Sequence, residues 1–313
     1  MRIATADDVR AALAWPDLVE ALRHAFVAGC EAPVRHHHTV PRAGQPDAVM
    51  LLMPAWQAEG FIGVKLVTVF PGNADRDLAA VNATYMLFDG DTGAPLASID
   101  GGELTARRTA AASALAADYL ARKDASTLLL CATGRLSTNL AEAHAAVRPI
   151  KRILVHGRSR GSIERTVEAL ANRDFEAVPA GDLEAATRRA DIISCATLST
   201  EPIVRGDWLM PGVHVDLVGA FTPTMRESDD AVFARADLVA VDTREGALKE
   251  AGDIVQATSS GALAEEKIAA DLFRLTRGSH PGRAHEDQIT VFKSVGTALE
   301  DLAAAILVHE RAM

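Results

Sequence analysis

The feature that most constrains the fold is an alternation of short apolar runs with helical segments in the second half of the chain. The apolar runs are 128–131, 153–156, 177–179, 192–196, 214–218 and 238–241. Between the first four runs the sequence has a helical pattern. Strands that alternate with helices form βαβ units, which build a parallel sheet with helices on both faces. The sequence therefore predicts an α/β fold with a Rossmann-type, doubly wound parallel sheet.

The first part of the chain has a different pattern. Its strand-like runs are 48–53, 63–70, 83–88 and 95–99. The last two runs flank Asp-Gly-Asp-Thr-Gly at 89–93, a hairpin signal, which favours antiparallel pairing and an α+β domain. An Ala-rich helical segment follows at 103–122, and another helical pattern lies at 296–310. We predict one domain formed by 1–118 with 289–313, and a nucleotide-binding domain formed by 119–288.

Composition narrows the classes of partner. The 313 residues carry a net charge of −10, and an acidic chain without a long basic run is a poor partner for nucleic acid or an anionic membrane. The three cysteines lie far apart in sequence, which indicates a reducing compartment. No apolar run has the length of a membrane span, and the first residues lack the apolar core of a signal peptide. We expect a cytoplasmic protein with a small-molecule partner.

The segment 132–137, Ala-Thr-Gly-Arg-Leu-Ser, follows the first apolar run of the predicted parallel sheet. A dinucleotide-binding fold carries G-x-G-x-x-G at this place, and only the middle glycine is present here, so the motif alone is a weak signal. Its position between a strand and a helix strengthens it, because a pyrophosphate binds at such a helix N-terminus. We predict cofactor contacts from Thr133, Gly134, Arg135 and Leu136.

The end of the second predicted strand indicates which dinucleotide binds. An acidic residue there would bind a ribose 2′-hydroxyl and repel a 2′-phosphate. This chain has Arg158, Ser159 and Arg160 instead, and guanidinium groups match phosphate geometry; the alternative is a solvated loop that happens to carry two arginines. We predict NADPH as the cofactor, with NADH as the second choice. Further cofactor contacts are expected from Thr109, Ala196, Thr197, Val218 and Gly219.

Three basic residues in the first domain form a candidate anion site. Lys65 lies inside an apolar strand, and Arg108 lies on the apolar stripe of the Ala-rich helix, whereas Arg35 lies in a loop. Buried cations need a partner, which a bound anion could supply. Each has a structural alternative: Lys65 could extend its ammonium to the sheet edge, and Arg108 could pair with a structural acid.

The run His36-His37-His38 invites a metal interpretation. Adjacent side chains of an extended segment point to opposite faces, so three consecutive histidines do not converge on one ion. We therefore predict no metal site.

Five segments together resemble the ornithine cyclodeaminase/mu-crystallin family. They are 63–73, 87–97, 104–113, 218–223 and 290–296. The resemblance covers nearly the whole chain. It implies a homodimer joined through the first domain, an NAD(P)-binding Rossmann domain and a substrate carboxylate held by basic residues. Matched position by position, these residues are Arg35, Lys65 and Arg108, with catalytic roles for the last two.

One departure from the family pattern separates its activities. Where the resemblance places the aspartate that serves ornithine deamination in cyclodeaminases, this chain has Phe221, and a phenyl ring cannot transfer a proton. The segment 218–227 looks more like the family's Δ1-pyrroline-2-carboxylate reductases. We expect NADPH-dependent reduction of a cyclic imino acid, Δ1-pyrroline-2-carboxylate or Δ1-piperideine-2-carboxylate, to the L-amino acid, with Phe221 in the substrate pocket.

Three alternatives remain from the sequence. Two are an amino-acid dehydrogenase and an ornithine cyclodeaminase of the same family. The third is a mu-crystallin-like protein that binds NADPH and a small ligand without turnover. An assay of turnover with cyclic imines separates the binding protein from the enzymes.

Overall fold

The computed structural model describes residues 1–76 and 78–312, which divide into two compact units. Unit 1 comprises Met1–Arg108 with Thr297–Met313, and unit 2 comprises Thr109–Gly296. The predicted domain limits, after 118 and before 289, differ from these. The helix α3 (Gly101–Leu120) runs through the first limit without a break, so no turn signal marks the change of unit. Residues 290–293 form a strand of the unit 2 sheet, which moves the second limit later in the chain.

Unit 1 is built on a six-stranded sheet with the order β1-β6-β5-β4-β3-β2. Its strands are β1 (Arg2–Ala4), β2 (His36–Val40), β3 (Ala48–Trp56), β4 (Phe61–Val69), β5 (Val81–Asp89) and β6 (Pro95–Asp100). Neighbouring strands are antiparallel except for β1, which pairs parallel with β6. The predicted hairpin joins β5 and β6, and the three consecutive histidines lie in the exposed strand β2.

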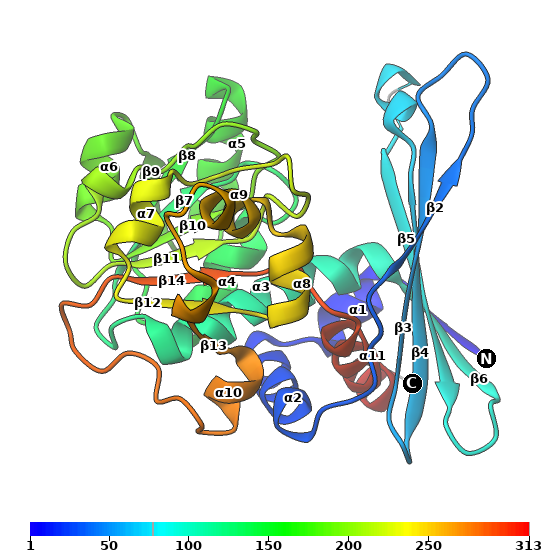
Figure 1. Ribbon diagram of the computed structural model, residues 1–313. Helices are drawn as coiled ribbons and strands as arrows, with labels where there is room; N and C mark the ends of the chain where they lie inside the picture. Colours follow the sequence, from blue (N-terminus) through cyan, green and yellow to red (C-terminus); the bar gives the residue numbers. More distant parts are fainter. Residues whose placement is uncertain (77, 313) are drawn as a thin grey trace. The chain divides into compact units, whose positions relative to one another are not determined.

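Helices cover one face of the unit 1 sheet. They are α1 (Ala6–Ala12) and α11 (Ala298–Ala312), and α2 (Trp15–Ala28) packs on α11. The helix α11 packs against β3, β4 and β5 and against α1 and α2, so it is the centre of the unit 1 core (Figure 1). Successive residues of β4 alternate between this covered face, where Gly63 and Lys65 are buried, and the opposite face, where Ile62 is 38% exposed. A short 3-10 segment, η1 (Pro71–Arg76), follows β4.

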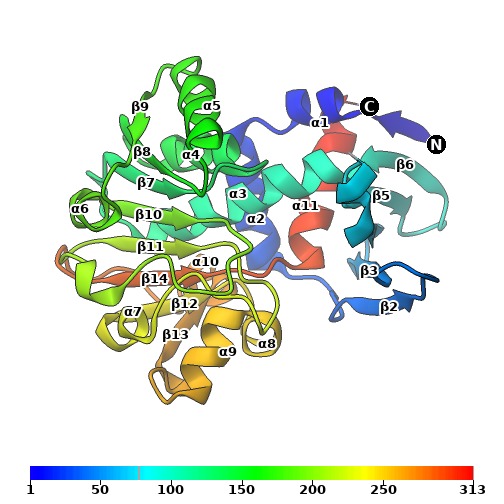
Figure 2. The same ribbon diagram turned by 90° about the horizontal axis from the view of Figure 1, so that it is seen from above.

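Unit 2 is built on an eight-stranded, wholly parallel sheet with the order β13-β12-β14-β11-β10-β7-β8-β9 (Figure 2). The strands are β7 (Thr127–Cys131), β8 (Arg152–His156), β9 (Glu176–Pro179), β10 (Ile192–Cys195), β11 (His214–Leu217), β12 (Leu238–Val241), β13 (Ile268–Asp271) and β14 (Thr290–Lys293). The strand order reverses between β7 and β10, the switch point where doubly wound folds bind ligands. The predicted fold class is confirmed.

The helices of unit 2 are short, and most begin at a side-chain cap. They are α4 (Ser137–Val147), α5 (Arg160–Ala171), α6 (Leu183–Arg189), α7 (Asp230–Arg235), α8 (Arg244–Glu250), α9 (Gly252–Ser259) and α10 (Leu272–Thr276), with 3-10 segments η2 (Gly206–Trp208) and η3 (Glu265–Lys267). Ser159, Asp182, Asp229 and Asp271 each accept a hydrogen bond from a backbone N–H in the first turn of the helix that they precede. Within the described part of the chain, no helix combines the length and apolar character that crossing a bilayer requires.

Candidate functional site

The predicted strand-end cofactor residues lie at one edge of the unit 2 sheet. The loops 133–136, 158–160, 196–197 and 218–219 follow β7, β8, β10 and β11, which are neighbours in the sheet. Because all four strands are parallel, their carboxyl ends share this edge. Thr109 is the exception, since it lies in the middle of α3 rather than at a strand end.

The turn at Gly134 fits a bound pyrophosphate. A Cβ added at Gly134 would meet no heavy atom within 4 Å, so the backbone faces open space. The helix α4 begins just after it, and no side chain caps its N-terminus. The Ser137 N–H donates to the Gly134 carbonyl oxygen at 3.1 Å, and the next N–H groups of the first turn are available to an anion. Ala132 fits the first position of the motif because it does not adopt the left-handed conformation that would require glycine.

The three residues that follow β8 differ in what they contact. The Arg160 Nε donates to Glu164 Oε1 at 2.7 Å, and the Ser159 hydroxyl caps α5. Arg158, within the described residues, forms no hydrogen bond or ion pair with the protein. Of the two predicted arginines, Arg158 therefore has the guanidinium that is available to a phosphate.

A buried carboxyl group supports the loops after β10 and β11. The Glu227 Oε1 accepts hydrogen bonds from the Thr197 backbone N–H at 2.6 Å and from its hydroxyl at 2.8 Å. Burial raises the pKa of Glu227 to about 7. A Cβ at Gly219 would lie 2.1 Å from the Thr197 carbonyl oxygen and 2.5 Å from Glu227 Oε1, so only glycine fits there. The sequence analysis did not assign Glu227 a role.

Lys293, at the end of β14, contacts backbone carbonyl groups at the same edge of the unit 2 sheet. Its ammonium donates to the backbone carbonyl oxygens of Leu217 at 3.1 Å and Ser294 at 2.9 Å, and to that of Gly219. The side chain is completely buried. All three of its N–H groups are thereby used by the backbone.

In unit 1, two of the predicted basic residues meet at one carboxylate. The Lys65 Nζ lies 2.7 Å from Asp301 Oδ2 and 2.8 Å from Oδ1, and the Arg108 Nε lies 2.8 Å from the same Oδ1. The Arg108 Nη1 also donates to Glu300 Oε2 at 2.7 Å. Lys65 is 2% exposed and Arg108 5%, and both carboxylates are fully buried. We call Lys65, Arg108, Glu300 and Asp301 the charged cluster.

The charge of Arg35 acts on Lys65, a member of the charged cluster. Burial lowers the pKa of Lys65 to about 8, opposed by the charge of Asp301 and assisted by those of Arg108 and Arg35. Arg35 lies between α2 and β2 and is half-buried. The three basic residues predicted for substrate binding therefore act on one another within unit 1.

Tyr85 completes the surroundings of Lys65. It lies opposite Lys65 in the register of β4 and β5 and is fully buried. Its hydroxyl lies over Gly63, where a Cβ would be only 2.0 Å away. Glycine at position 63 is thus required by the packing of this tyrosine.

The sequence analysis missed Glu300, Asp301 and Tyr85. The available signal for the two acids was their place within the apolar helical pattern at 296–310. Acidic residues near a helix start are usually solvated and stabilise the helix dipole, which hides such a signal.

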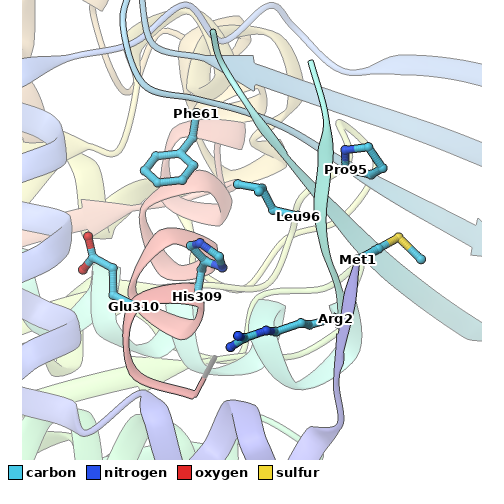
Figure 3. A pocket seen from close by; sticks show the side chains of 7 residues that line it. All are labelled: Met1, Arg2, Phe61, Pro95, Leu96, His309 and Glu310. Atoms are coloured by element: carbon cyan, nitrogen blue, oxygen red, sulfur yellow. The ribbon is translucent and has the colours of Figure 1, made fainter. Parts of the chain in front are cut away.

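Two further features are the predicted pocket residue Phe221 in unit 2 and a hollow in unit 1. Phe221 is 44% exposed and follows Ala220, whose φ of 50° is left-handed. A hollow of about 570 Å³ in unit 1 is lined by Met1, Arg2, Phe61, Pro95, Leu96, His309 and Glu310 (Figure 3). None of the predicted site residues lines this hollow, so we do not assign it to the candidate site.

The fold and these residues define a dinucleotide-binding α/β protein with a charged cluster in unit 1, and comparisons identify its family. The ornithine cyclodeaminase/mu-crystallin family model matches residues 1–313. The chain belongs to this family, as the motifs predicted.

Individual relatives agree with this assignment. The Δ1-pyrroline-2-carboxylate reductase of Paracoccus denitrificans is 39% identical over 306 residues, which cover 95% of this chain and 93% of that protein. The Δ1-pyrroline-2-carboxylate reductase of Thermococcus litoralis, solved with NADH and L-proline, is 32% identical with a TM-score of 0.92, over 100% of this chain and 97% of that one. An archaeal alanine dehydrogenase dimer with bound NAD is 29% identical with a TM-score of 0.90, over 100% and 96%.

Proposed function

We propose that this protein reduces a cyclic imino acid, Δ1-pyrroline-2-carboxylate or Δ1-piperideine-2-carboxylate, to the L-amino acid with NADPH. Its relatives are reductases that act on a carbon–nitrogen bond, and the protein is an oxidoreductase of this kind. The observation that carries the proposal is the charged cluster. Two cations are buried and held in place by carboxylates, on a chain 39% identical to a reductase whose substrate is a carboxylate.

The charged cluster supports binding of the substrate carboxylate. An ammonium has three N–H donors, and the contacts of Lys65 go to the two oxygens of a single carboxylate, Asp301. Lys65 thus keeps donor capacity for a second anion, and Arg35 and Arg108 add positive charge nearby. Fixing the carboxylate orients the planar ring, and orientation is a large part of the barrier for such a reaction.

Residues of unit 2 hold the cofactor in this proposal. The open turn at Gly134 accommodates the pyrophosphate, and Thr197 and Gly219, braced by Glu227, form the floor beside the switch point. The bound dinucleotide supplies the hydride. Lys65 is mostly protonated at neutral pH, because its pKa is about 8, and it can hold or release a proton at Nζ.

Arg158 supports the choice of NADPH. Its guanidinium follows β8, at the position where an acidic residue would select a ribose hydroxyl, and it is available to a 2′-phosphate. The two solved relatives described above hold NADH or NAD, so NADPH selectivity is specific to this proposal.

Phe221 supports an imine rather than ornithine as substrate. A buried ammonium beside a phenyl ring without a carboxylate costs several kcal/mol, and cation–π contact returns about 0.5–2 kcal/mol. A planar imine ring can lie against the phenyl group without that cost.

We further propose a homodimer formed through unit 1. Helices cover one face of its sheet, while the opposite face presents apolar side chains from paired positions of β3 and β4: Trp56 is 37% exposed and Ile62 38%. Exposed apolar side chains that lie next to each other on a sheet face favour a protein interface. The archaeal relative was solved as a dimer.

The test measures NADPH oxidation with Δ1-pyrroline-2-carboxylate beside ammonia release from L-ornithine. We expect rapid imine reduction and no ammonia. Rapid ammonia release without imine reduction would assign a cyclodeaminase instead. Activity on neither substrate would favour a dehydrogenase or a binding protein.

A further inference from the structure

We propose that Asp301 is a positioning residue of this active site, whose single carboxylate orients Lys65 and Arg108 together and maintains Lys65 as an ammonium. The inference rests on the proposed function, because it assigns a role to Asp301 through the two cations that would bind the substrate carboxylate.

The geometry supports a shared orienting role. Lys65 comes from β4, Arg108 from α3 and Asp301 from the first turn of α11. The Asp301 Oδ1 accepts hydrogen bonds from Lys65 and from Arg108, both at 2.8 Å, whereas Glu300 pairs with Arg108. Asp301 therefore couples the position of one cation to that of the other.

A stability role explains this arrangement poorly. Burying two cations and two carboxylates carries a large desolvation cost, and well-packed apolar residues of similar volume often give equal or greater stability. We therefore attribute a different benefit to the charged cluster, which is the fixed orientation of its hydrogen-bond donors. Side chains held in one geometry before substrate binds lose less entropy when they bind it.

The groups around Lys65 show what the Asp301 charge does. Around Lys65 lie Asp301 from α11, with Glu300 beside it on Arg108, Arg108 from α3, Arg35 from the segment before β2, and Tyr85 from β5. Burial, Arg108 and Arg35 all lower the pKa of Lys65, while Asp301 raises it. Removing the charge of Asp301 leaves the lowering influences unopposed, so the ammonium of Lys65 loses its proton at a lower pH.

The experiment compares kcat/KM for Δ1-pyrroline-2-carboxylate across pH in the full-length protein, Asp301→Asn and Glu300→Gln. In the unmodified protein we expect kcat/KM to fall above about pH 8, as Lys65 loses its proton. In Asp301→Asn this decline should begin at least about one pH unit lower, and KM should rise by about tenfold or more. Glu300→Gln, the matched control, should lower kcat/KM without moving the decline.

Two measurements guard against loss of the fold and failure of the proposed function. Asp301→Glu keeps the charge but displaces the oxygens, so it should retain the position of the decline while raising KM. Lysine 13Cε resonances, assigned with Lys65→Arg, report the Lys65 titration without substrate. If Asp301→Asn shifts the Lys65 titration but the unmodified protein has no reductase activity, only the proposed function is rejected. An unmoved titration in a folded Asp301→Asn protein would overturn the role of Asp301.

Discussion

The two units each contain a buried lysine, and their different partners separate structure from function. Lys293 in unit 2 donates to three backbone carbonyl groups, so its donors are used by the fold. Lys65 in unit 1 contacts the carboxylate of one side chain. A buried lysine saturated by backbone is a structural brace, whereas one oriented by a carboxylate, with donor capacity remaining, is suited to bind an anion.

The acids near the two lysines, Asp301 and Glu227, also differ in their contacts and in the direction in which their pKa is shifted. Asp301 is in direct contact with Lys65 and Arg108, and its pKa is lowered by their charges despite its burial. Burial raises the pKa of Glu227 to about 7, opposed by the charge of Lys293, and its carboxyl group accepts hydrogen bonds from the Thr197 backbone N–H and hydroxyl. The charged cluster thus favours the ionised form of Asp301, while burial at the carboxyl edge of the unit 2 sheet favours the protonated form of Glu227.

The largest expected effect comes from replacing each of the two buried lysines in turn. Lys65→Met should lower kcat/KM by about 10³-fold, a loss of about 4 kcal/mol of transition-state stabilisation, because the substrate carboxylate loses an oriented cation. Lys293→Met should instead destabilise the fold by about 3 kcal/mol or more, because it removes a donor from three carbonyl groups and leaves those of Gly219 and Ser294 unpaired, while that of Leu217 keeps the Ser294 N–H. Steady-state kinetics and chemical denaturation of both variants measure the two effects.

The reverse outcome would contradict this separation. If Lys65→Met unfolds the protein while Lys293→Met folds normally and loses activity, Lys65 is the structural brace. NADPH binding to unit 2, followed by fluorescence, provides the control that Lys65→Met retains its cofactor site.

A smaller effect sharpens the account of unit 2. Arg158→Ala should weaken NADPH binding by about tenfold, or about 1.4 kcal/mol, with little change for NADH, because it removes the cation placed for a 2′-phosphate. Arg160→Ala is the matched control and should change NADPH affinity less, since its guanidinium is 92% exposed and paired with Glu164. Fluorescence titrations of both variants with both cofactors are the measurement. Equal NADPH affinity in Arg158→Ala and the unmodified protein would remove the argument for NADPH.

The sequence predicted the parallel sheet because its strands are short and buried, as in β12 (Leu238–Val241), where apolar composition and turn signals coincide. It did not predict β13 and β14 or the limits of the units. The residues Thr290–Lys293 include a threonine and a lysine, and the burial of Lys293 depends on carbonyl groups brought from β11.

The candidate site was predictable in part for a related reason. Lys65 and Arg108 were identifiable because a charge on an apolar face is visible in the sequence. Their partner Asp301 was not, because the pairing joins residues 236 and 193 positions apart. Local periodicity carries no information about which distant side chain completes such a pair. The roles of these residues in binding and catalysis stay predictions.

The central claim is that the charged cluster binds the substrate's carboxylate, and truncating the substrate tests it most directly. The measurement is kcat/KM for Δ1-pyrroline-2-carboxylate relative to Δ1-pyrroline, which lacks the carboxylate, in the unmodified protein and in Lys65→Met. We predict a preference of about 10³-fold for the carboxylated imine in the unmodified protein, falling to about tenfold or less in the variant. The same preference in both proteins would contradict the claim.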